Sequence, residues 1–401
     1  MADQAIHFHR LSFVPDGLDV IVGRPDAGSY AVLPRDGAEL LRHLTEGMSA
    51  RRAAEWYETT FGEPVDVSDF LESMDGLGFL RPADAPIAPA AAPRFQWLGR
   101  VLFSRPAWTG YLLIATACLY LLVRQPELRP RPSMVYFTGS LVLVQLLVLF
   151  GQTPLAFLHE SFHVLAMRRL GLPSKLSVSN RLTYVVFETQ SSGLLSVPRN
   201  RRYLPFLAGI LLDLEVFFIL DLVASVTRSG NGFTLVGRIC LAVSYVVAAR
   251  IGWQFLLYLR TDLYYVLATA LNCQDLHDAS TAIFANRMRR FFRRTAHLVD
   301  EEQWTQRDRR VGSWYGWFLL VGYTAAFGLI LFVFVPVILI YLERGSSGLL
   351  SDPSGGRFWN SVFSLVIVAF NVVLPIFLAR RKRRMNADRR PRLVSDSHGV
   401  M

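Results

Sequence analysis

Charged residues are scarce in this chain of 401 residues: Asp, Glu, Lys and Arg make up 18% of it, whereas hydrophobic residues make up 52%. Soluble domains carry about 25% charged residues. The deficit excludes an ordinary soluble enzyme, a disordered protein and a fibrous protein. Cysteine is scarce as well. The three cysteines contain no close pair, which excludes a disulfide scaffold and a cysteine-based zinc finger.

Long apolar stretches reach or approach the roughly 20 residues that a helix needs to cross a bilayer. They lie at 108–123, 134–170, 204–226, 235–259, 314–342 and 358–378. The N-terminus (MADQAIHFHRLSF) lacks the uninterrupted apolar core of a secretory signal, so we expect the first segment to start and stay in the cytoplasm. The pattern predicts an integral, multi-pass, α-helical membrane protein.

Basic residues select the topology, because they concentrate in cytoplasmic loops. If 134–170 crosses once, the cytoplasmic side holds the basic residues of 175–202, the arginines of 287–310 and the tail that begins Arg380-Arg381. Two crossings would move the arginine loop outside. We therefore expect about six crossings with both termini cytoplasmic, and a bend or break near Pro154. The Arg/Phe mixture of that loop (NRMRRFFRRTAHL) favours contact with anionic membrane lipid over nucleic-acid binding.

Residues 1–82 predict a small soluble α+β domain, followed by a Pro/Ala-rich linker at 83–104. Short strands are expected at 18–23, 29–33 and 78–80. Three helices are expected between them, with N-terminal signals at Asp36 and Glu39 (a capping box), at Ser49, and at Asp66 or Ser68. This order is a winged-helix pattern. Its last helix (VDVSDFLESMDGLGF) carries only acidic charges, which argues against DNA binding.

The same pattern resembles the leader-recognition domains of ribosomal peptide modification, of the type found in pyrroloquinoline quinone synthesis. The resemblance covers residues 6–82. It implies that a leader peptide is captured as an added strand on the edge of the sheet. The alternative is a domain with only a regulatory or packing role.

The sequence His159-Glu160-Ser161-Phe162-His163 lies inside the second apolar stretch. Positions i and i+4 share a helix face, so both histidines can direct a nitrogen at one metal ion. Glu160 can take a proton from water beside that metal, as a catalytic general base. Zinc suits imidazole ligands. A pair of buried histidines that only joins helices is the alternative, but ionisable residues inside lipid usually mark function.

Two histidines leave a zinc site incomplete, so a third ligand has to come from elsewhere in the chain. Its candidates in or near the apolar segments are Glu188, Asp213, Glu215, Asp221, Asp262 and His277.

The segment LHESFHVLAMRRLG, a polar hairpin-like stretch and a later crossing resemble the site-2 protease superfamily of intramembrane zinc metallopeptidases. More specifically, they resemble the branch of peptide zinc metalloproteases within it, and the resemblance covers residues 140–280. Its third ligand is the aspartate of a motif that reads approximately Phe-Asp-Gly-Tyr-Tyr-x-Leu. This chain has Thr261-Asp262-Leu263-Tyr264-Tyr265-Val266-Leu267, so the resemblance assigns the metal role to Asp262. Glu188 and Asp213 stay as alternatives, and Leu263 departs from the family glycine.

Two further features lie near this motif. Asp213, Glu215 and Asp221 fall on one predicted crossing, and Arg250 on the next crossing predicts an ion pair with one of them; water access to the metal is the alternative. Residues 176–190 alternate as a strand or hairpin does, which could hold a substrate in extended form.

The sequence therefore predicts a membrane zinc metallopeptidase domain at 105–380 and a basic cytoplasmic tail at 381–401. Glu160 is the expected catalytic residue, and His159, His163 and Asp262 are the expected Zn²⁺ ligands. A peptide or membrane-protein substrate and a leader peptide are the expected partners. Two alternatives remain: a membrane peptide receptor or export partner that does not cleave, favoured by Leu263, and a metal-dependent transporter.

Overall fold

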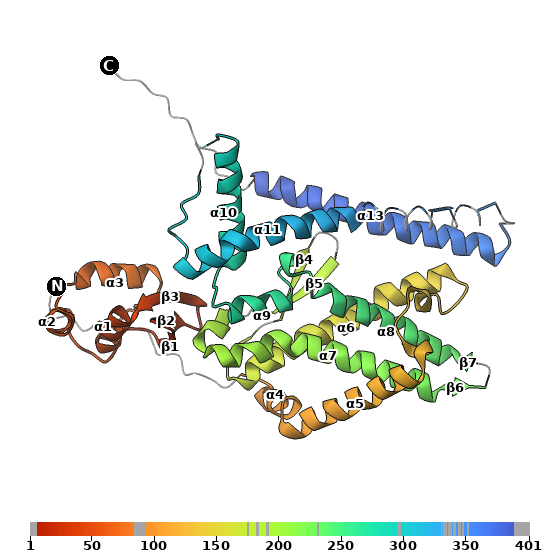
Figure 1. Ribbon diagram of the computed structural model, residues 1–401, viewed down its shortest axis with the longest axis horizontal. Helices are drawn as coiled ribbons and strands as arrows, with labels where there is room; N and C mark the ends of the chain where they lie inside the picture. Colours follow the sequence, from red (N-terminus) through yellow and green to blue (C-terminus); the bar gives the residue numbers. More distant parts are fainter. Residues whose placement is uncertain are drawn as a thin grey trace, which may run out of the picture.

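The computed structural model describes residues 6–83, 93–174, 176–181, 184–189, 192–230, 232–294, 298–329 and 353–388, with isolated residues between 331 and 350. Most of this chain is helical. A small domain with the only three-stranded sheet of the described residues lies at one end of a bundle of long helices (Figure 1). The short hairpin of β6 (Arg228–Ser229) and β7 (Gly232–Phe233) lies at the opposite end.

The N-terminal domain is an antiparallel meander followed by three helices. Strands β1 (Ser12–Asp16), β2 (Asp19–Arg24) and β3 (Ser29–Pro34) pair in the order β1-β2-β3. Helices α1 (Arg35–Thr45), α2 (Ala50–Phe61) and α3 (Val67–Gly76) cover the sheet. A core of Val22, Leu41, Met74 and Phe79 joins strands to helices. The domain therefore has its own hydrophobic core.

Several details of this domain differ from the expectation. Strand β1 was not expected, and residues 78–80 contribute one bridge, between Phe8 and Leu80, in place of a strand. The capping box was wrong: Pro34 is the N-cap of α1, and no side chain caps that helix. Asp66 does cap α3, because its carboxylate accepts hydrogen bonds from two backbone N–H groups of the first turn.

Three helices among the described residues are long and apolar enough to span a membrane: α5 (Arg105–Arg124), α6 (Leu141–Arg169) and α8 (Leu235–Trp253). Helix α7 (Arg199–Val226) packs on α5, α6 and α8. Helix α6 is one continuous helix through Pro154, so residues 141–169 form a single segment without a break.

Strands β4 (Leu176–Arg181) and β5 (Tyr184–Thr189) form the hairpin that the alternation at 176–190 indicates. Helix α4 (Gln96–Leu102) lies within the expected linker and packs closely on α6: a Cβ at Gly99 would come within 2.3 Å of the carbonyl oxygen of Leu165. The linker residues 84–92 lie outside the described part of the chain.

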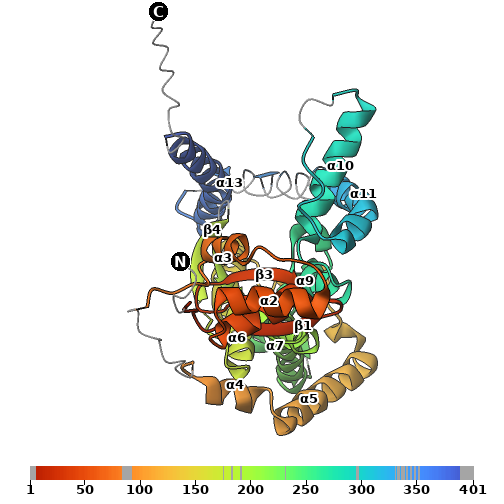
Figure 2. The same ribbon diagram turned by 90° about the vertical axis from the view of Figure 1, so that its left-hand side faces the viewer.

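The chain continues through the short helix α9 (Asp262–Ala270), then α10 (Leu276–Phe291) and α11 (Gln306–Leu329), which pack together. Helix α13 (Gly356–Asp388) follows and contacts α6. It includes the first residues of the expected basic tail, 381–388, whereas 389–401 lie outside the described residues. Viewed from the side of the N-terminal domain, α10–α11 and α13 form two separate arms above the bundle (Figure 2).

Candidate metal centre

His159 and His163 lie one turn apart on α6, and both are buried, at 6% and 7% exposure. Their Nε2 atoms are 3.1 Å apart. The four-residue spacing of the two histidines in HESFH therefore places both rings on one face of α6, and each ring presents a nitrogen to the same point, as metal binding requires.

The other nitrogen of each ring faces an acceptor on α7. Nδ1 of His159 lies 2.9 Å from Oδ2 of Asp213, and Nδ1 of His163 lies 2.7 Å from the carbonyl oxygen of Pro205. An imidazole that donates from Nδ1 to these oxygens keeps a lone pair on Nε2. Helix α7 therefore fixes the tautomer and orientation that metal-ligating histidines have.

Asp262 is the first residue of α9, and its carboxylate completes the cluster. Its Oδ2 lies 3.1 Å from Nε2 of His159 and 3.4 Å from Nε2 of His163. Its backbone N–H donates to Oε1 of Gln254, at 3.1 Å. Thr261, the N-cap residue of α9, donates its hydroxyl to the backbone carbonyl of Gln254, at 2.6 Å. Gln254 thus anchors the start of α9 at both residues.

A glycine on α7 leaves room at the point where these atoms meet. A Cβ at Gly209 would lie 2.4 Å from Nε2 of both His159 and His163. Atoms that are not bonded to each other do not approach so closely. A side chain at this position would therefore occupy the space between the histidines that a metal ion requires.

Asp213 also binds Arg250 of α8, which is the ion pair expected between neighbouring crossings. Nε of Arg250 donates to Oδ2 of Asp213 at 2.9 Å, and Nη2 pairs with Oδ1. Asp213 is fully buried, so its charge needs this counterion. The interactions of Arg250 with Asp213 and of Asp213 with His159 thus connect α8, α7 and α6. They lie on the Nδ1 side of His159, away from the candidate metal position.

The donor set fits a zinc ion. Two imidazole nitrogens and one carboxylate oxygen are zinc ligands, and a tetrahedral site with bonds of about 2.0–2.1 Å separates them by about 3.3 Å. The separations here, 3.1, 3.1 and 3.4 Å, match that figure. Three protein ligands leave one position for water or substrate, as in catalytic zinc sites.

The structure thus brings together His159, His163 and Asp262, and these form the only cluster of potential ligands found among the described residues. Asp213 lies behind His159 and does not face the cluster. Glu215, Asp221 and His277 are not part of it. Glu188 lies on β5, but its side chain is outside the described part of the chain. Glu160 is half-buried and follows His159 on α6.

Leu263 lies in the first turn of α9, with helical backbone, so this position needs no glycine dihedral. The left-handed residue of this region is Arg260, at φ 56°.

Sequence reasoning missed Pro205, Gly209 and Gln254. The first two carried a signal: Pro205, Gly209 and Asp213 follow one another at intervals of four residues, which places them on one face of α7. Gln254 carried none, because its role depends on the fold of the turn before α9.

No protein-family model, curated protein or solved structure matches this chain. The geometry of the metal centre and the chemistry of its residues therefore carry the functional argument.

Proposed function

We propose that this protein is an intramembrane zinc metalloendopeptidase that hydrolyses a peptide bond in a peptide or a membrane-tethered protein. The observation that carries the proposal is the convergence of His159, His163 and Asp262 on one point, on helices of a largely apolar bundle. Glu160 is the next residue after His159 on α6. A leader peptide of a ribosomally made, modified peptide is one candidate substrate.

The residues have distinct roles in this reaction. His159, His163 and Asp262 would hold the zinc ion, which when bound would supply a Lewis acid for the scissile carbonyl and for the attacking water. Glu160 accepts a proton from the attacking water and delivers it to the nitrogen of the leaving amine. Asp213 and the carbonyl of Pro205 keep the two imidazoles oriented with Nε2 toward the site.

The position of the site along the helices supports its access from the cytoplasm. His163 lies six residues before the end of α6, about 9 Å along the helix. The N-terminal domain covers the same end of the bundle, where the hydroxyl of Tyr30 and Oγ of Ser196 are 3.0 Å apart. We propose about six crossings with both termini cytoplasmic, which puts this end of the bundle on the cytoplasmic side.

The N-terminal domain has a sheet that supports peptide capture. Strands β1 and β3 are its outer strands, and each has one edge that no other described strand occupies. We propose that the domain is of winged-helix type and binds a leader peptide by strand addition, which satisfies the main-chain groups of such an edge. The β4–β5 hairpin, which contacts α6, offers a second edge beside the helix that carries the two histidines.

The deciding experiment measures zinc per chain and peptide cleavage in the same preparations of the full-length protein. Wild type should bind about one zinc ion, and His163→Ala and Asp262→Ala should lose it. Glu160→Gln should keep the zinc and lose cleavage of a fluorogenic peptide library.

Zinc that persists in Asp262→Ala would refute the ligand set. Zinc binding without cleavage of any peptide in wild type would contradict the peptidase and favour a peptide receptor on the same fold. Metal-coupled flux into liposomes would identify a transporter.

A further inference from the structure

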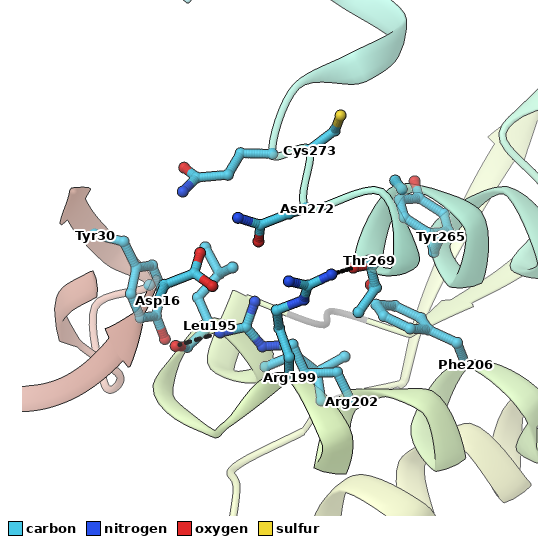
Figure 3. A pocket seen from close by; sticks show the side chains of 14 residues that line it. Asp16, Tyr30, Leu195, Arg199, Arg202, Phe206, Tyr265, Thr269, Asn272 and Cys273 are labelled. Atoms are coloured by element: carbon cyan, nitrogen blue, oxygen red, sulfur yellow. Dashed lines mark hydrogen bonds between the residues drawn. The ribbon is translucent and has the colours of Figure 1, made fainter. Parts of the chain in front are cut away.

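A cavity of about 300 Å³ lies between the N-terminal domain and the neighbouring end of the helical bundle. Asp16 and Tyr30 of the N-terminal domain form one wall (Figure 3). Gly28 of the same domain also lines the cavity. The opposite wall comes from the first turns of α7, the end of α9 and the segment after it, with Arg199, Arg202, Phe206, Tyr265, Thr269 and Asn272 among its residues. Residues of both domains thus line the cavity.

Two arginines of this cavity make hydrogen bonds to backbone carbonyls, and among the described residues neither forms a salt bridge with a carboxylate. Arg199 donates to the carbonyl oxygens of Thr269 and Ala270, at 2.6 and 2.9 Å, at the end of α9. Arg202 donates from Nε to the carbonyl of Val197, at 2.9 Å. Among the described residues, no carboxylate lies within ion-pair distance of either guanidinium.

Arg202 is the more unusual of the two, because it is only 7% exposed. Burial lowers the pKa of its guanidinium, since the charged form loses hydration. A buried charge is costly unless an opposite charge compensates it. The cavity wall holds one acid, Asp16, against two arginines, so the cavity has a positive excess that an anionic ligand would neutralise.

One face of α7 connects this cavity to the metal centre. Arg202, Phe206, Gly209 and Asp213 follow at intervals of four, three and four residues, the spacing of a single helix face. The ring of Phe206 stacks on that of Tyr265, with centroids 5.4 Å apart and planes 14° apart. Tyr265 lies one turn after Asp262 on α9. The aromatic pair therefore lies one turn from the metal centre on both helices.

We propose that this cavity is a substrate subsite that binds a carboxylate of the peptide to be cleaved, with Arg202 as its main contact and Arg199 as the second. Arg202 and Gly209 are seven positions apart, which is about 10 Å along the helix. An extended peptide covers that span with about three residues, at about 3.3 Å each. The carboxylate therefore lies about three residues from the scissile bond, and the intervening side chain packs on Phe206 and Tyr265.

This assignment rests on the proposed peptidase function and names the substrate class of that site. The carboxylate can belong to an internal Glu or Asp, or to the C-terminus of the peptide. Three fluorescent probes distinguish these sources: a blocked Ala/Leu peptide with one internal Glu, the same peptide with Gln, and an Ala/Leu peptide with a free C-terminal carboxylate. Their affinities are measured by fluorescence anisotropy on full-length, zinc-loaded Glu160→Gln protein in nanodiscs, which prevents hydrolysis during the measurement.

We expect one of the two carboxylate probes to bind at least about tenfold tighter than the Gln probe, and Arg202→Gln to remove that preference. Arg201→Gln is the matched control, because Arg201 is the exposed neighbour on α7 and does not line the cavity. It should keep the preference. Asp16→Asn removes the one acid of the cavity wall and should tighten binding of the preferred probe, even if Arg202→Gln does not fold.

Equal affinity for all three probes, or a preference that survives Arg202→Gln, would overturn the subsite. Because peptide binding is measured without cleavage, the experiment tests the subsite proposal separately from the proposed peptidase activity. A protein that cleaves peptides without the preference refutes only the subsite. A protein with the preference that hydrolyses no peptide refutes only the peptidase.

Discussion

Gly209 of α7 lies so close to His163 of α6 that a methyl group on its Cα would come within 2.4 Å of Nε2. The same methyl group would lie equally close to Nε2 of His159. The absence of a side chain at this position is therefore as much a requirement of the metal centre as the three ligands are.

Replacing Gly209 with alanine should abolish metal binding although every ligand remains. The added Cβ would occupy the metal position or push the imidazoles apart, and we expect zinc affinity to fall by at least about 100-fold. Zinc titration of the full-length variant measures this. Gly110→Ala is the control, because Gly110 lies within α5 with open space around its Cα, and alanine there should leave zinc binding unchanged. Full zinc affinity in Gly209→Ala would contradict the geometry of the site.

Asp213→Asn should weaken zinc binding by about 10- to 100-fold, because His159 loses the negative charge that supports it from behind. Arg250 loses its counterion in the same variant. The control is Asp221→Asn. Asp221 is equally buried on α7, but it accepts from Ser244 and does not contact a ligand. Equal zinc affinities of the two variants would show that the charge behind His159 has no role.

Gln254 should matter for metal binding although it is not a ligand. In Gln254→Ala the N–H of Asp262 loses its acceptor, so the start of α9 is less well fixed and zinc affinity should fall by about tenfold. Gln254→Glu keeps an acceptor at that position and should retain most of the affinity. Equal zinc affinities of Gln254→Ala and Gln254→Glu in a zinc titration would contradict this anchoring role.

The histidines of the site were readable from sequence because the information is local: a five-residue motif on one helix sets their relative position. Asp262 required a family resemblance, since nothing in its own segment points to residues 159–163. Gln254 depends on how the chain turns between α8 and α9, which no local pattern encodes. The sequence thus predicted the three groups that converge at the candidate metal site, and it missed most of those that hold them in place.

In the fold, too, the features that depend on local sequence were predicted, and those that depend on tertiary contacts were missed. The apolar runs predicted the long helices, because hydropathy and length can be read directly from the sequence. Strand β1 was missed because Pro15 interrupts its pattern. Proline is tolerated there since β1 is an outer strand of the sheet. The capping box failed because α1 begins at Arg35, so Asp36 lies inside its first turn and not at the N-cap. There its carboxylate accepts a hydrogen bond from the hydroxyl of Tyr57 on α2.

This Tyr57–Asp36 hydrogen bond makes a pH-dependent contribution to the stability of the N-terminal domain. The hydroxyl of Tyr57 lowers the pKa of Asp36, and the carboxylate raises the pKa of Tyr57 to about 12. The contribution of Asp36 is therefore present above its ordinary pKa of 3.8 and lost as the pH falls through its lower folded value. That of Tyr57 is present below its ordinary pKa of 10.0 and lost as the pH rises through about 12.

Tyr57→Phe should remove this contribution, which is about 0.5–1.5 kcal/mol for a hydrogen bond of this kind. Near neutral pH, amide hydrogen exchange of α1 and α2 in the full-length protein should be faster in the variant than in wild type. As the pH falls through the lowered folded-state pKa of Asp36, its carboxylate becomes protonated in the folded state as well, and the two proteins should converge. A difference in exchange that stays constant from neutral to acidic pH would mean that Tyr57 stabilises the domain through the packing of its ring, and that the charge of Asp36 contributes nothing.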